Sequence, residues 1–181
     1  CFAEMVSKKS QRVRCAAQSL NLAVGVSEVA AAAAADLERA MQGSYEVLPG
    51  AVATLAALRD AGYRLGLLSN CYVGAKGVAE GLGLGAFFAC LTLSFEVGLC
   101  KPDPRLYYYV CERLGCEPTQ AWFAGDGNDR ELDGAKAAGL RTVLVQCATS
   151  AAWATTPSSG ADFAAASIAD VADIVLSADG A

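Results

Sequence analysis

The chain has 181 residues, 54% of them apolar, and a formal net charge of −5 at pH 7. This length suits one domain with a real hydrophobic core, and the apolar content argues against disorder. The negative charge argues against nucleic acid as a partner, and the lack of a long strongly apolar window predicts no membrane span. Histidine is absent, which excludes Ser-His-Asp triads, Cys-His pairs and histidine-ligated metals.

The cysteines predict free thiols and not a disulfide scaffold. There are eight of them, with no Cys-x-x-Cys pair. Cys90, Cys111 and Cys147 lie in apolar runs and are expected to be small core residues. We therefore expect an intracellular, reducing compartment, either cytoplasm or an organelle interior.

Residues 1–45 are expected to form an N-terminal arm and a helical segment. The arm carries a basic cluster between Lys8 and Arg14, and an alanine-rich stretch up to Met41 has high helix propensity. Residues 46–181 are expected to form the core domain, because strand and helix signals alternate there.

From Leu48 onward the elements follow one another at short intervals. Helices are predicted over 51–61, 74–83, 104–114, 131–138 and 168–176, with strands over 63–68, 87–93, 122–124, 142–145 and 162–166. Residues 96–104 and 150–160 are expected to be loops. This alternation predicts an α/β fold, a doubly wound Rossmann-like parallel sheet.

Polar side chains follow three of the predicted strands. Ser69 and Asn70 end one strand, Lys101 lies in the loop after the next, and Asp126 and Glu131 follow a third. Because the carboxyl ends of parallel strands share one edge, these groups are expected to meet there. A hydroxyl, an ammonium and two acids suit a phosphate and a hard cation, most simply Mg²⁺.

Each of these groups also has a purely structural interpretation. Ser69-Asn70 could be a turn or a helix cap, and Lys101 a solvated lysine. Asp126 and Glu131 could be acids placed near a helix start. The order of these residues along the chain favours a shared phosphate and cation site over the separate structural interpretations.

In series, these segments resemble the haloacid dehalogenase-like (HAD) hydrolase superfamily over residues 48–176. LGLLSN resembles its second motif, SFEVGLCKPDP its third and AGDGNDRELDGAKAAG its fourth. The resemblance implies a HAD-like three-layer sandwich with a truncated helical cap segment at the N-terminus. It also implies that Ser69 and Asn70 bind phosphate, that Lys101 neutralises the phosphate charge, and that Asp126 and Glu131 hold Mg²⁺. Asp129 and Asp133 fall off the ligand spacing and are expected to be solvated.

The family's first motif, Asp-x-Asp, does not occur in this sequence. It would supply the nucleophile and the general acid–base group on the central strand. Arg12 to Val24, with Ser19 and Asn21, is one degenerate candidate, and the Asp-Gly within Ile174–Ala181 is a weaker one. We favour a cap remnant over residues 1–45 with the first strand upstream of Cys1, so the chain as given is expected to be inactive.

A missing central strand also has a structural consequence. Unpaired backbone groups in a core are costly, so residues 13–17, a strand from another chain or a rearranged sheet is expected to close the gap.

Two functions follow. The first is a Mg²⁺-dependent phosphomonoester hydrolase core acting on a small phosphorylated metabolite, with haloacid dehalogenation as a less favoured variant. The second is a non-catalytic HAD-like subunit whose protein partner completes the sheet or docks the N-terminal arm.

Overall fold

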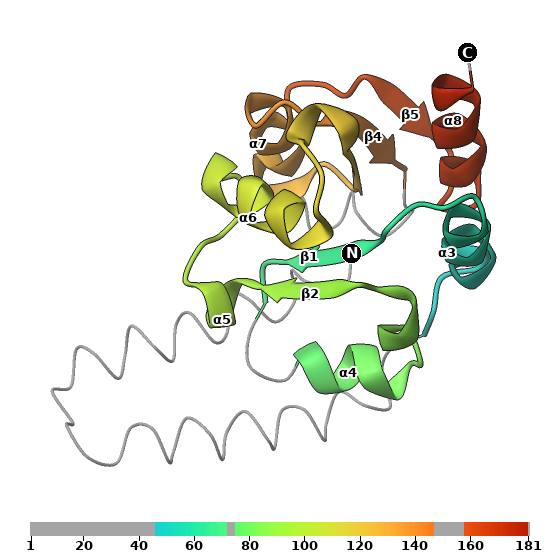
Figure 1. Cartoon of the computed structure of the whole chain (residues 1–181), viewed down its shortest axis with the longest axis horizontal. Coiled ribbons are helices and arrows are strands. Elements are labelled where there is room, and N and C mark those ends of the chain that lie inside the picture. The colour runs from blue at the N-terminus through green and yellow to red at the C-terminus, as the bar shows by residue number, and fades with distance from the viewer. Residues whose placement is uncertain (1–45, 72–74, 147–157, 181) are drawn as a thin grey trace, which may run out of the picture.

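The computed structural model describes residues 46–71, 75–146 and 158–180. Figure 1 shows helices arranged around short parallel strands. The predicted arm and cap segment over residues 1–45 lies outside the described residues, so that division of the chain stays a prediction. No helix in the described part of the chain is long and apolar enough to cross a membrane.

The described elements alternate between helix and strand as the sequence predicts. The helices are α3 (Ala51–Asp60), α4 (Ala75–Gly81), α5 (Ser94–Val97), α6 (Pro104–Leu114), α7 (Glu131–Ala137) and α8 (Asp170–Asp179). The strands are β1 (Gly66–Ser69), β2 (Cys90–Leu93), β3 (Trp122–Gly125), β4 (Arg141–Val145) and β5 (Phe163–Ala165). Single 3₁₀ turns cover η1 (Gly85–Phe87), η2 (Pro118–Gln120) and η3 (Asn128–Arg130).

Every strand pairing is parallel. β1 pairs with β2, and β4 pairs with both β3 and β5, giving the orders β1-β2 and β3-β4-β5. Among the described residues, β1 has no second partner and neither has β3. A strand between β1 and β3 is not among the described residues, so its source stays a prediction. Residues 13–17, one predicted source, lie outside the described residues.

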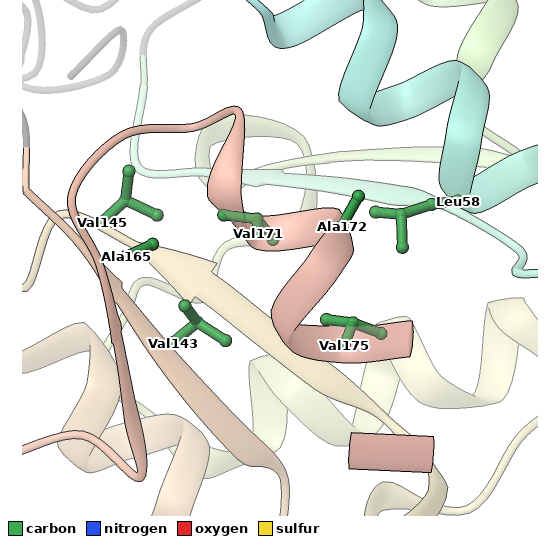
Figure 2. Packing of buried hydrophobic residues seen from close by; sticks show 7 residues of the cluster. All are labelled: Leu58, Val143, Val145, Ala165, Val171, Ala172 and Val175. Carbon is green, nitrogen blue, oxygen red and sulfur yellow. The ribbon is translucent and has the colours of Figure 1, made fainter. Parts of the chain in front are cut away.

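Helices cover the β3-β4-β5 sheet on both faces. On one face, α3 and α8 enclose a cluster drawn in Figure 2, consisting of Leu58, Val143, Val145, Ala165, Val171, Ala172 and Val175. On the other face, α6 and α7 enclose a second cluster: Tyr107, Cys111, Ala135, Ala138 and Leu140. Helix, sheet and helix therefore form three layers, which confirms the predicted α/β class.

α6 shows why the sequence folds as it does. Pro104 occupies its first turn, and the Asp103 carboxylate caps it by accepting the Arg105 backbone N–H at 3.0 Å. Gly115 ends the helix in the left-handed conformation. The predicted bounds of 104–114 are confirmed.

Several predicted bounds need correction, among them those of α8, which runs over Asp170–Asp179 and not over 168–176. β1 begins at Gly66 and not at residue 63, because the Tyr63 N–H instead closes the end of α3 on the Leu58 carbonyl. β2 begins at Cys90, since residues 85–87 form the turn η1. The predicted loop from Glu96 starts inside α5, a single helical turn that ends at left-handed Gly98.

The cysteines in the described residues are free. Cys90 and Cys111 are buried, which confirms them as small core residues. Burial raises the pKa of the Cys111 thiol to about 11. Cys147 lies outside the described residues.

Candidate active site

Asn70, directly after β1, fixes the backbone of Lys101. Its side-chain Nδ2 donates to the Lys101 carbonyl at 3.1 Å, and its Oδ1 accepts the Lys101 N–H at 2.8 Å. Asn70 is buried, so this reciprocal pair is sheltered from water. The end of β1 is thereby tied to the loop that follows β2.

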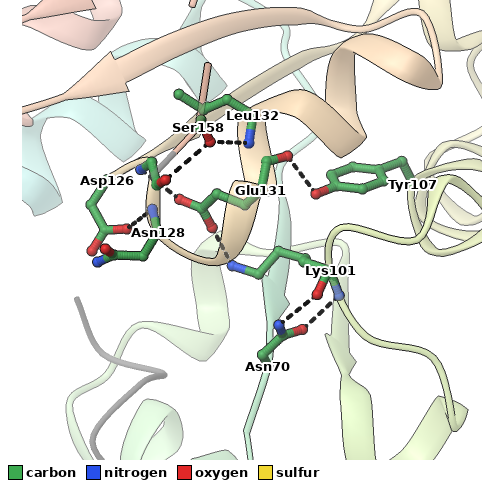
Figure 3. Close-up of polar contacts among 9 residues, drawn as sticks. Asn70, Lys101, Tyr107, Asp126, Asn128, Glu131, Leu132 and Ser158 are labelled. Atoms are coloured by element: carbon green, nitrogen blue, oxygen red, sulfur yellow. Dashed lines mark hydrogen bonds and ion pairs between the residues drawn. The ribbon is translucent and has the colours of Figure 1, made fainter. Parts of the chain in front are cut away.

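The Lys101 side chain reaches the start of α7. Its Nζ forms an ion pair with Glu131 Oε2, and the two side chains are 10% and 6% exposed (Figure 3). The structural alternative of a solvated lysine is therefore wrong, because the ammonium is paired and enclosed. The Lys101 ammonium also lies 5.7 Å from the centre of the Phe123 ring.

Glycine at position 134 permits this approach. A Cβ there would lie 2.2 Å from the Pro102 carbonyl oxygen, well inside contact distance. The loop carrying Lys101 packs directly on the α7 backbone, and this close packing brings the ammonium to Glu131.

The second oxygen of Glu131 is held by the loop before it. Glu131 Oε1 accepts the Gly127 N–H at 3.0 Å. A Cβ at Gly125, the last residue of β3, would lie 2.2 Å from the same oxygen. Glycine at the strand end therefore lets a buried carboxylate sit against it.

Asp126 occupies the turn between β3 and η3. It is half-buried, and its Oδ1 accepts the Asn128 N–H at 3.1 Å. Burial by itself raises the pKa of Asp126, but contacts that favour the charged form, among them this hydrogen bond, lower it overall. Beside it, Asn128 is buried, and its Nδ2 has no hydrogen-bond partner among the described residues.

Tyr107 forms a hydrogen bond with the backbone of Glu131. Its hydroxyl donates to the Glu131 carbonyl at 2.6 Å, and the side chain is only 1% exposed. Burial raises the pKa of the phenol, so it stays a neutral donor. Tyr107 is not one of the predicted site residues, although its position three residues after Pro104 places it on the buried face of α6.

A second segment missed from the sequence is Ser158-Ser159. Ser158 bonds to Gly127 and Leu132, and Ser159 bonds to the Asp133 carboxylate. These serines precede β5 and lie in the predicted loop over residues 150–160, for which the sequence indicates no role in the site.

The expectation that Asp133 is solvated is wrong, because its side chain is 14% exposed and is bound by Arg130 and Ser159. Asp129 is half-buried. Hydrogen bonding from the Ser159 hydroxyl is the main cause that lowers the pKa of Asp133. Asp133 therefore has a structural role, because its carboxylate joins Arg130 to Ser159.

Ser69 is buried at the carboxyl end of β1, beside Asn70. No described hydrogen bond joins its hydroxyl to Lys101, Asp126 or Glu131. Hydrogen bonds and an ion pair thus join Asn70, Lys101 and Glu131 into one network next to Asp126. Ser69 is connected to this network only as the chain neighbour of Asn70 among the described contacts.

These side chains lie at the carboxyl ends of parallel strands in a three-layer α/β core, which is the edge where such sheets bind ligands. A model of the haloacid dehalogenase-like hydrolase family matches residues 9–139. The chain therefore belongs to that family.

Individual relatives agree. A glyceraldehyde 3-phosphate phosphatase of Methanopyrus kandleri is 35% identical over 99 residues, which is 54% of this chain and 42% of the relative. A (S)-2-haloacid dehalogenase of a Pseudomonas species is 35% identical over 118 residues, 61% of this chain and 50% of the relative. The chain thus spans half or less of these curated relatives.

Solved structures give the same fold. A HAD phosphatase from Thermococcus onnurineus superposes with a TM-score of 0.68 at 26% identity, covering 77% of this chain and 63% of that one. The fold agreement extends over most of this chain.

Proposed function

We propose that this chain carries the phosphate-binding and Mg²⁺-binding half of a HAD-type phosphomonoester hydrolase site. The observation that supports it is the buried Lys101–Glu131 ion pair, with Asn70 fixing the lysine and Asp126 next in the acidic loop. It joins three sequence segments that were expected to meet at one sheet edge.

The residues fit a magnesium ion. Asp126 and Glu131 offer carboxylate oxygens, the donors that Mg²⁺ prefers, and Mg²⁺ commonly takes one or two carboxylates plus water and substrate phosphate. Within the described ranges, no group of three or more His, Cys, Asp or Glu side chains is placed to hold a metal ion. A bound Mg²⁺ would neutralise charge on a phosphoryl group.

The neighbouring side chains take distinct roles in this proposal. The Ser69 hydroxyl donates to a phosphate oxygen, and the Lys101 ammonium balances phosphate charge. Asn70 was expected to bind phosphate as well, but its amide is engaged with the Lys101 backbone, so we assign it to orienting the lysine.

Turnover needs groups that this sequence does not display. Without an Asp-x-Asp pair, the chain has neither the aspartate nucleophile nor the acid–base aspartate that the family resemblance requires. Serine or asparagine cannot replace both roles, since nucleophilic and general acid–base catalysis each contribute large rate factors. We therefore expect no phosphatase activity from these 181 residues alone.

Thermal unfolding in Mg²⁺ with and without inorganic phosphate tests the binding half. Phosphate should raise the melting temperature of the wild type, and Lys101→Met should remove that increment. Lys136→Met is the matched control, because Lys136 pairs with Asp162 at a more exposed position. A phosphate effect that survives in Lys101→Met, or none in the wild type, contradicts the proposal.

An activity assay tests the other half of the proposal. The chain alone should not hydrolyse p-nitrophenyl phosphate above the rate of the Lys101→Met variant. Mg²⁺-dependent turnover by the wild type would show that the catalytic groups are present after all.

The substrate class is proposed as a small phosphorylated metabolite. A relative's name specifies glyceraldehyde 3-phosphate for that protein, and this chain shares only part of its length. Haloacid dehalogenation is less favoured, because two carboxylates beside the lysine suit a retained cation. The free thiols in the described residues favour a reducing intracellular compartment.

A second candidate is a non-catalytic HAD-like subunit. It is favoured by β1 and β3, each of which has a single partner strand among the described residues, because an open strand edge accepts a strand from another chain. A well-folded monomer by light scattering, with no co-purifying partner, would count against this candidate.

A further inference from the structure

The loop that separates Asp126 from Glu131 has an unfavourable backbone. Gly127 has φ 83°, and the next left-handed residues, Asp129 (φ 51°) and Arg130 (φ 55°), are not glycines. Left-handed conformations disfavour residues with a Cβ. Such a loop keeps its shape only if its surroundings hold it.

Ser158 holds both ends of this loop (Figure 3). Its backbone N–H and its hydroxyl both donate to the Gly127 carbonyl, at 2.8 and 3.0 Å. Its Oγ accepts the Leu132 N–H at 3.1 Å. One serine thus bridges the residue after Asp126 and the residue after Glu131.

Ser159 holds the following turn. Its N–H and hydroxyl both donate to Asp133 Oδ1, at 2.8 and 2.7 Å. The other Asp133 oxygen accepts Arg130 Nε at 3.0 Å, so the left-handed Arg130 is tied to the same carboxylate.

The link to the acids is direct. The Gly127 residue whose carbonyl is held by Ser158 donates its own N–H to Glu131 Oε1 at 3.0 Å. Movement of Gly127 would release the Glu131 carboxylate and shift Asp126, its chain neighbour. The spacing of the two carboxylates therefore depends on Ser158.

We propose that Ser158, assisted by Ser159 through Asp133, is a positioning residue that sets the Asp126–Glu131 geometry for cation binding. This inference rests on the proposed function, since it assigns Ser158 a role toward the proposed Mg²⁺ site. It adds a residue outside the three motifs, contributed by the segment that leads into β5.

Calorimetric titration of the full chain with MgCl₂ tests the role. Ser158→Ala should weaken Mg²⁺ binding by roughly 10-fold or more, as outer-shell contacts commonly do, and Ser158→Thr should restore it by returning the hydroxyl. Ser167→Ala is the control, because Ser167 donates its N–H and hydroxyl to the Asp170 carboxylate at the start of α8, in a segment that contributes no proposed Mg²⁺ ligand. These are the contacts that Ser159 makes with Asp133. The Mg²⁺ affinity of Ser167→Ala should equal that of the wild type.

The outcomes separate the two proposals. If the wild type binds Mg²⁺ and Ser158→Ala binds it equally well, the positioning role is wrong and the proposed function stands. If the wild type binds no Mg²⁺, both are overturned. If Ser158→Ala does not fold, Ser159→Ala and Asp133→Asn replace it; unchanged affinity in both overturns the role, and a loss in either supports it.

Discussion

The ammonium of Lys101 and the carboxylate of Glu131 form an ion pair in the interior of the protein, joining segments 30 residues apart. Removing one partner of such a pair leaves an uncompensated buried charge. Lys101→Met should therefore lower the free energy of unfolding by about 3 kcal/mol in urea titrations without Mg²⁺.

The exposed pair of Lys136 and Asp162, 2.8 Å apart, provides the control for that loss. Lys136→Met should cost at most about 1 kcal/mol, because exposed pairs contribute little. Equal losses in the two variants would mean that the Lys101 pair is energetically no different from a surface contact.

Gly134→Ala tests the packing that brings the lysine loop to α7. Alanine normally favours a helix over glycine by about 1 kcal/mol, but here its Cβ meets the Pro102 carbonyl at 2.2 Å. We expect a net loss of about 1–3 kcal/mol by denaturant unfolding. Gly81→Ala, in α4 with nothing within 4 Å, should be neutral or stabilising; a similar loss there would refute the packing explanation.

Tyr107→Phe tests the hydrogen bond from the Tyr107 hydroxyl to the Glu131 carbonyl. The variant loses the 2.6 Å hydrogen bond to the Glu131 carbonyl in a buried setting, so it should lose about 1 kcal/mol of stability. Tyr108→Phe is the neighbouring control, since Tyr108 is 47% exposed. The stabilities of both variants are measured by thermal unfolding. If Tyr107→Phe unfolds at the same temperature as Tyr108→Phe and the wild type, the Tyr107 hydrogen bond does not stabilise the fold.

Asp179 provides a prediction for pH dependence. Its carboxylate accepts hydrogen bonds from Tyr63, Trp122 and Arg141. The bond from Tyr63 is the largest cause lowering its pKa.

Because the folded-state pKa lies below the unfolded one, the stabilisation is present above the unfolded value and is lost as pH falls through the folded one. Asp179→Asn should cost about 1 kcal/mol at pH 7. In denaturant titrations between pH 7 and pH 3, the difference in unfolding free energy between Asp179→Asn and the wild type should shrink as the pH falls. A difference that stays constant with pH would show that ionisation of Asp179 does not stabilise the fold.

The order of elements could be predicted because each has a local signal. Pro104 and Gly115 bracket α6, and apolar runs mark β3 and β4. The meeting of Lys101 with Glu131 followed from the rule that parallel strands end at one edge. These inferences need only neighbours in sequence and one topological rule.

The supports of the site could not be predicted in the same way. Ser158 reaches Gly127 across 31 residues, and nothing local in its Ser/Gly-rich surroundings distinguishes it from a loop residue. The spacing of Asp133 predicts a solvated acid, whereas Ser159 binds its carboxylate from a distant segment. Long-range partners of this kind depend on the folded chain.

The most direct test of the proposed half-site is thermal unfolding of the full chain with and without millimolar Mg²⁺, in the wild type and in Asp126→Asn. Mg²⁺ should raise the melting temperature of the wild type and of Asp173→Asn, an exposed acid on α8, but not of Asp126→Asn. An equal Mg²⁺ effect in all three proteins, or none in the wild type, would contradict the assignment of Asp126 and Glu131 as a magnesium site.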